Sequence, residues 1–202
     1  MKQNFELRNE AFAMLKGNWK EPVLLYLIIS AISVVATFIV PDVANLATTI
    51  LLVYPCSYLF SVQLMSFVRE GKSNLTSDFF QLFKEKYGIA LPVMALAFLY
   101  TFLWTLLFII PGIIKGYSYA LTQYISIDNQ TLKAEECINQ SMKMMNGNKW
   151  RLFLLDLSFI GWYLLAIFFT LGIGLLWVVP YHETARIFFY EDLKSQPQLV
   201  EE

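Results

Sequence analysis

Four long stretches with little or no charge dominate the sequence. Residues 22–40, 43–68 and 88–110 contain no charged side chain, and residues 152–180 contain only Asp156. A helix needs about 20 apolar residues to cross about 30 Å of hydrocarbon. The composition agrees with this reading, because 57% of the residues are hydrophobic and only 15% are charged, whereas a soluble domain is about one quarter charged. We therefore expect an all-α, polytopic transmembrane helical bundle.

Turn signals divide these stretches into six spans. The Pro-Gly pair at 111–112 should turn the chain back, so that residues 112–127 form a fourth, short span. The Gly-x-Gly motif at 172–174 splits the last stretch in the same way. Three hairpins result, with spans at about 22–40, 43–68, 88–110, 112–127, 151–170 and 173–190. The alternative is a four-span protein in which residues 112–127 and 181–190 lie in the interface.

A threefold internal repeat favours six spans. A short amphipathic segment precedes each hairpin, and its apolar residues recur at the i, i+3, i+4 spacing of a helix with one apolar face. An aromatic residue, Trp19, Tyr87 or Trp150, lies at the end of each segment. The segments are residues 4–19, 78–88 and 131–150. The repeats cover about 4–68, 76–127 and 131–192 of a single membrane domain, 1–202, and we expect the amphipathic segments to be interfacial helices.

The basic residues predict the orientation. Of the 15 Lys and Arg residues, all but Lys115 fall in the segments before the hairpins or near the C-terminal end. Lys and Arg accumulate in cytoplasmic loops, so we expect both termini to be cytoplasmic. Trp19, Tyr87 and Trp150 then lie at the inner headgroup level as interfacial anchors, because aromatic side chains favour that position.

Four residues form a candidate intramembrane polar cluster: Asp156, His182, Glu183 and Arg186. Polar groups inside a membrane are costly and mark functional sites. At 1.5 Å per residue, Asp156 and Arg186 reach similar depths on antiparallel helices, so we expect a salt bridge. The cluster is either a proton or ion site with a titratable histidine or a polar contact that fixes the last hairpin. The usual pairing of intramembrane charge favours the second reading.

Several chemistries are disfavoured. His182 is the single histidine and Arg186 replaces the second histidine of an HExxH motif, so no zinc site is expected. We expect no metal, no cofactor and no catalytic residues, and Cys56 and Cys137 should stay reduced. A formal net charge of −1 gives no reason to expect nucleic acid.

Four segments resemble a known group of proteins. They are LWTLLFIIPGIIKGYSY at 103–119, SMKMMNGNKWRLF at 141–153, LSFIGW at 157–162 and GIGLLWVVPYHETARIFFY at 172–190. Together with Gly17 and Trp19, they resemble an uncharacterised family of bacterial integral membrane proteins, a domain-of-unknown-function family common in Gram-positive bacteria. The resemblance implies a plasma-membrane location and no established activity.

Two functions remain as hypotheses. The first is a non-enzymatic multi-pass plasma-membrane protein, an accessory or scaffold protein that binds the lipid bilayer, a membrane-protein partner or a second copy of itself. The alternative is a small-solute or ion transporter or channel that uses the polar cluster. A water-accessible cavity reaching the cluster would favour transport, whereas a dry, paired cluster would favour the scaffold.

Overall fold

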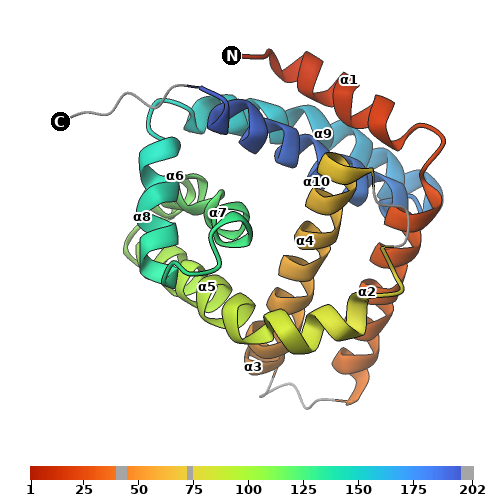
Figure 1. Cartoon of the computed structure of the whole chain (residues 1–202), viewed down its shortest axis with the longest axis horizontal. Helices are drawn as coiled ribbons and strands as arrows, with labels where there is room; N and C mark the ends of the chain where they lie inside the picture. The colour runs from red at the N-terminus through yellow and green to blue at the C-terminus, as the bar shows by residue number, and fades with distance from the viewer. Residues whose placement is uncertain (40–44, 72–74, 197–202) are drawn as a thin grey trace.

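The computed structural model describes residues 1–39, 45–71 and 75–196, and every regular element in these ranges is a helix (Figure 1). The all-α fold class is therefore confirmed. The helices are α1 (Asn4–Leu15), α2 (Lys20–Ile39), α3 (Asn45–Thr48), a π-helical turn η2 (Thr49–Val53), α4 (Tyr54–Glu70), α5 (Phe79–Leu107), α6 (Ile109–Tyr119), α7 (Thr122–Asp128), α8 (Ala134–Met144), α9 (Lys149–Thr170) and α10 (Leu175–Lys194).

Three helical segments are long and apolar enough to cross a membrane: Leu46–Glu70, α5 and α9. The pair formed by α1 and α2, which bends by 96°, is a fourth candidate. Within the described residues, the spans expected at 112–127 and 173–190 do not meet this criterion. The first is divided between the short helices α6 and α7, and the second corresponds to α10, which carries several charged side chains.

The connection between α5 and α6 differs from the expected Pro-Gly turn. The chain reverses at Phe108, which is extended (φ −157°, ψ 141°) between the two helices. Pro111 lies in the first turn of α6, where its missing N–H breaks no helical hydrogen bond. Gly112 permits the close approach of the two helices, because a Cβ there would lie 2.6 Å from Cα of Thr105. The glycine is therefore needed for packing rather than for the turn.

The other two expected turns have different outcomes. Residues 171–174 connect α9 to α10 where the sequence predicts a turn, with Leu171 and Gly172 at φ 50° and 90°. The turn expected between the spans 22–40 and 43–68, at residues 40–43, lies outside the described residues.

Two of the three amphipathic segments form separate helices, α1 and α8. Each is followed by a glycine with positive φ, Gly17 at 88° and Gly147 at 77°, a conformation that costs other residues more than glycine. The segment at 78–88 is instead the first part of α5, because Gly88 stays helical and does not end the helix.

The apolar faces of α1 and α8 pack into the bundle. Leu7, Ala11 and Leu15 of α1 are fully buried, as are Cys137 and Ile138 of α8. Burial of aliphatic side chains at about 25 cal/mol per Å² is the main attraction that holds such helices to the bundle. Both helices are therefore integral parts of the fold.

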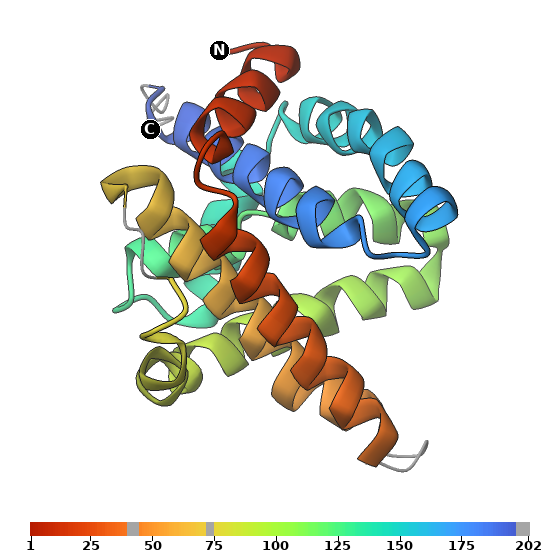
Figure 2. The ribbon, with the colours of Figure 1, turned by 90° about the vertical axis from the view of Figure 1, so that its right-hand side faces the viewer.

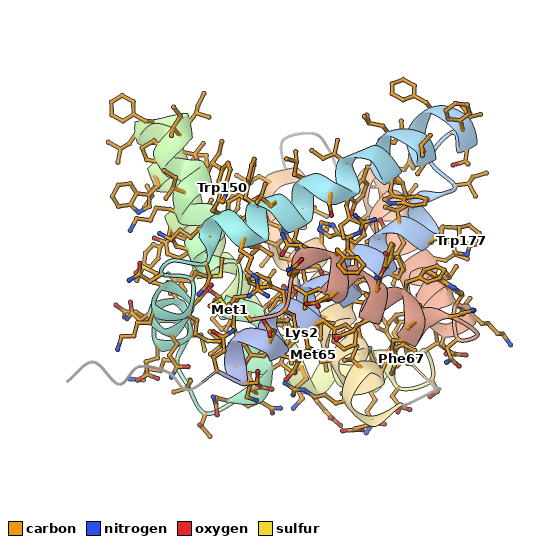
Figure 3. The ribbon with its side chains drawn as sticks, turned by 90° about the horizontal axis from the view of Figure 1, so that it is seen from above. Met1, Lys2, Met65, Phe67, Trp150 and Trp177 are labelled. Carbon is orange, nitrogen blue, oxygen red and sulfur yellow. The ribbon has the colours of Figure 1, made fainter. Side chains whose placement is uncertain are left out.

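The molecule has an apolar end and a charged end. We define the apolar end by the C-terminal end of α2, the α5–α6 connection and the α9–α10 connection, which lie toward the right in Figure 2. The charged end contains α8 and the C-terminal ends of α4 and α10. Figure 3 shows the α5–α6 and α9–α10 pairs splaying apart toward the apolar end, where most side chains are hydrocarbon. Exposed side chains there include Phe38, Leu106, Phe108, Ile110 and Phe169.

Candidate functional site

The structure brings the four residues of the polar cluster together. Asp156 lies two turns into α9, and His182, Glu183 and Arg186 lie on neighbouring positions of α10, which packs antiparallel to α9. Antiparallel packing places the early part of α9 beside the middle of α10. The regular rise of both helices is therefore sufficient to align these side chains.

Asp156 is the acceptor at the centre of the cluster. Arg186 donates from Nε to Oδ1 at 2.9 Å and from Nη2 to Oδ2, so the pair is bidentate. His182 Nε2 lies 2.8 Å from Oδ1, and the Tyr117 hydroxyl donates to Oδ2 at 3.2 Å. Bidentate guanidinium–carboxylate contacts are among the stronger hydrogen-bonded pairs. One carboxylate thus joins α6, α9 and α10.

His182 extends this network toward the apolar end. Its Nδ1 lies 3.0 Å from the hydroxyl of Tyr163 on α9. The imidazole also stacks on Phe159, with the ring centroids 4.5 Å apart. Tyr117, Asp156, His182 and Tyr163 therefore form a continuous hydrogen-bonded chain. Such a chain can orient its members, and it can also carry protons when its ends reach water.

Glu183 connects α10 to two other helices. Its Oε1 accepts hydrogen bonds from Ser61 of α4 at 2.6 Å and from Tyr124 of α7 at 2.9 Å. A third donor, Gln123 Nε2, lies 3.3 Å away. Neutral donors satisfy this oxygen, whereas no hydrogen bond to Oε2 is found among the described residues. Glu183 therefore combines a positioning role with one available acceptor.

The cluster is enclosed only in part. The side chains of Asp156 and His182 are each 15% exposed, and that of Arg186 is 30% exposed. Two surface depressions are lined by Trp150, and neither includes any of the four cluster residues. Among the described residues, no group of three or more His, Cys, Asp or Glu side chains is arranged to hold a metal ion.

The three anchor aromatics lie in different environments. Trp19 packs edge-on against Phe12 and Tyr181 at centroid distances of 6.3 and 6.4 Å. Tyr87 donates a hydrogen bond to the carbonyl oxygen of Leu51 at 2.9 Å. Both side chains therefore help to pack helices together. Trp150 differs, because 67% of its surface is exposed.

The structure contains an ion-pair network at the charged end that the sequence did not predict. Asp128, at the end of α7, accepts hydrogen bonds from Arg69 at 2.6 Å, Lys194 at 2.6 Å and Tyr190 at 2.7 Å. Arg69 also donates to Glu191 at 2.7 Å. Burial alone would raise the pKa of Asp128, but the hydrogen bonds from Arg69, Lys194 and Tyr190 hold that pKa below its ordinary value. The network joins the ends of α4, α7 and α10.

A second contact at this end holds the N-terminal segment. Arg151 of α9 pairs with Asp192 of α10 at 2.6 Å, and the Lys2 backbone N–H donates to Asp192 at 3.1 Å. The partners in both networks are dozens of residues apart, so no local motif connects them. The sole sequence signal is the concentration of charge near the ends of these helices.

Comparison with known proteins gives one match. Residues 75–197, more than half of the chain, match a family described as "Protein of unknown function (DUF975)". The matched part runs from the residues just before α5 to the end of α10 and includes all four residues of the polar cluster. No curated protein and no solved structure matches the chain.

The Asp156–Arg186 contact predicts a measurable coupling. Asp156→Ala leaves the guanidinium without its carboxylate, so the free energy of unfolding should fall by about 3–5 kcal/mol. Arg186→Ala should act similarly, and the double variant should lose less than the sum by about 0.5–3 kcal/mol. Chemical unfolding in mixed micelles measures all three variants.

The exposed Lys2–Glu10 pair, 2.7 Å apart, is the matched control. Its double-mutant cycle should give a coupling of at most about 1 kcal/mol. Additive effects at Asp156 and Arg186 would contradict the coupling that we expect from their geometry.

Proposed function

The chain belongs to the DUF975 family of proteins of unknown function, and we propose that it is a non-enzymatic multi-pass protein of the cell membrane. In this proposal it is a scaffold or accessory protein whose charged end binds lipid headgroups or a membrane partner. The observation that supports a scaffold most directly is that the charged groups of the polar cluster bind other side chains of the bundle. Asp156 and Arg186 satisfy each other, and Glu183 accepts hydrogen bonds from α4 and α7.

Pairing within the bundle is the expected arrangement where charge serves packing. An unpaired charge at a span centre costs about 2.5–3.5 kcal/mol on insertion scales. A paired charge inside the bundle limits that cost and fixes which helix faces meet. The cluster thus favours one arrangement of α6, α9 and α10 over others.

We further propose that the chain crosses the membrane six times as three hairpins with both termini in the cytoplasm. The exposed apolar side chains at one end and the ion pairs at the other support this orientation. In this arrangement α10 and the α6–α7 pair cross within the bundle. Neighbouring helices, rather than lipid, then contact their polar groups. This explains how α10 can cross despite its charged side chains.

Cysteine labelling tests this topology. Ile173→Cys, in the exposed α9–α10 connection, should react with an impermeant maleimide added to intact cells. Asn139→Cys, on the exposed face of α8, should react only after the membrane is permeabilised. Both variants carry Cys56→Ala and Cys137→Ala, so that the native thiols do not contribute. The reverse pattern would contradict the proposed orientation.

A proton transporter is the second candidate, and two observations favour it. The hydrogen-bonded chain from Tyr117 through Asp156 and His182 to Tyr163 contains titratable groups throughout. The side chain of Arg186 is 30% exposed, so the cluster is not fully enclosed by the bundle. Only a flux measurement separates this candidate from a scaffold.

The purified chain in liposomes provides that measurement. A potassium gradient with valinomycin drives proton uptake, which an enclosed pH-sensitive dye reports. The scaffold proposal predicts uptake equal to that of protein-free liposomes, with no change in Glu183→Gln. Uptake above that level that is lost in Glu183→Gln would reject the scaffold in favour of transport.

A further inference from the structure

Two surface depressions meet at Trp150, near the N-terminal end of α9. One has a volume of about 430 Å³ and its lining includes Lys2, Asn4 and Arg151. The other has a volume of about 170 Å³ and lies between α6 and α9, lined by Ile113, Ile114, Tyr117, Lys149, Trp150 and Phe153. Figure 3 shows Trp150 beside the N-terminal end of α9. The exposed indole forms a wall of both depressions.

Two cations line the first depression, and each is paired with a carboxylate. Lys2 pairs with Glu10 at 2.7 Å, and Arg151 pairs with Asp192 at 2.6 Å. Lys149 lines the second depression instead, and its ammonium has no ion pair within the described residues. Of the three cations around Trp150, Lys149 therefore carries the positive charge that has no carboxylate partner among the described residues.

Two further features affect the positive potential beside Trp150: one fixes the position of Arg151, and the other is the N-terminal end of α9. The guanidinium of Arg151 lies 5.0 Å from the centroid of the Phe189 ring, which fixes its position along with Asp192. No side chain caps α9, because Asn148 at the N-cap makes no hydrogen bond to the first turn. The uncapped N–H groups add to the positive potential that the three cations create.

The second depression is apolar. Two isoleucines of α6 form one wall, and the Phe153 and Trp150 rings, stacked at a centroid distance of 4.9 Å, form the other. Tyr117 closes the inner side by packing edge-on against Phe153 at 5.9 Å. An alkyl chain therefore suits this depression, whereas a small polar anion does not.

We infer that the two depressions together bind one anionic phospholipid of the inner leaflet. The phosphate lies near Lys149 and the N-terminal end of α9, and an acyl chain passes the Trp150 ring into the groove between α6 and α9. Basic pockets at the cytoplasmic ends of membrane helices attract anionic headgroups in this way. The inference rests on the proposed membrane orientation and specifies the lipid class that the scaffold recognises.

Native mass spectrometry of the full chain tests the site. The chain is released from micelles that contain equal amounts of phosphatidylglycerol and phosphatidylcholine, and the retained lipid is identified. We expect phosphatidylglycerol to predominate. Lys149→Gln should lower its retention about fivefold, as the loss of ~1 kcal/mol per basic side chain at a membrane surface implies, with phosphatidylcholine unchanged. Lys143→Gln, on the exposed part of α8, is the matched control and should have little effect.

A second pair of variants tests the apolar groove. Ile113→Trp fills the groove and should lower the retention of phosphatidylglycerol, whereas Ile110→Trp, on the same helix but outside the groove, should not. Excess glycerol 3-phosphate should not displace the lipid. Displacement would show a site for soluble phosphate esters and would overturn the inference, as would equal retention of both lipids or equal effects of Lys149→Gln and Lys143→Gln.

Failure of this site can be distinguished from failure of the proposed function. Loss of lipid selectivity with the Ile173→Cys and Asn139→Cys labelling pattern intact rejects the lipid site alone. Reversed labelling rejects the membrane orientation on which the site rests.

Discussion

The carboxylate of Asp156 is the contact on which the arrangement of the helices depends. Asp156 itself lies on α9. Its carboxylate forms hydrogen bonds with Arg186 and His182 of α10 and with Tyr117 of α6. Apolar helices in lipid have no strong preference for one rotation over another, because a hydrocarbon side chain is equally soluble in lipid and in the bundle. A single bidentate charge pair removes that freedom, since rotation of either helix would leave a charge unpaired. The apolar faces then pack around a fixed reference point.

The charged end repeats the same principle outside the apolar region. Asp128 accepts hydrogen bonds from Arg69, Lys194 and Tyr190. Asp192 accepts hydrogen bonds from Arg151 and from the N-terminal segment. These carboxylates tie together helix ends that the polar cluster does not reach. Among the described residues, no ion pair joins the α5–α6 pair to the α9–α10 pair at the apolar end, where the two pairs splay apart (Figure 3). The polar contacts found among the described residues therefore join the helices at the middle of the molecule and at the charged end. They do not join the two helix pairs at the apolar end.

The sequence predicted the helical class and the meeting of Asp156 with Arg186, because apolar length and helical rise are regular. The sequence did not predict contacts that depend on how other helices rotate and pack. Examples are the hydrogen bonds of Ser61 and Tyr124 to Glu183, and the ion pair between Asp128 and Arg69. The α5–α6 turn was misplaced because proline is tolerated in the first turn of a helix, so Pro111 and Gly112 belong to α6 and Phe108 makes the reversal. Gly88 does not end a helix, and the second amphipathic segment therefore merges into α5.

Through its contact with Tyr117, Asp156 fixes the placement of α6 against α9. Spin labels at Ile110 on α6 and Phe168 on α9, both exposed near the apolar end, report that placement through their distance distribution in lipid nanodiscs. We expect one narrow distribution in the otherwise native chain and a clearly broader one in Asp156→Ala. An unchanged distribution in Asp156→Ala, or two separate distances without that substitution, would contradict it.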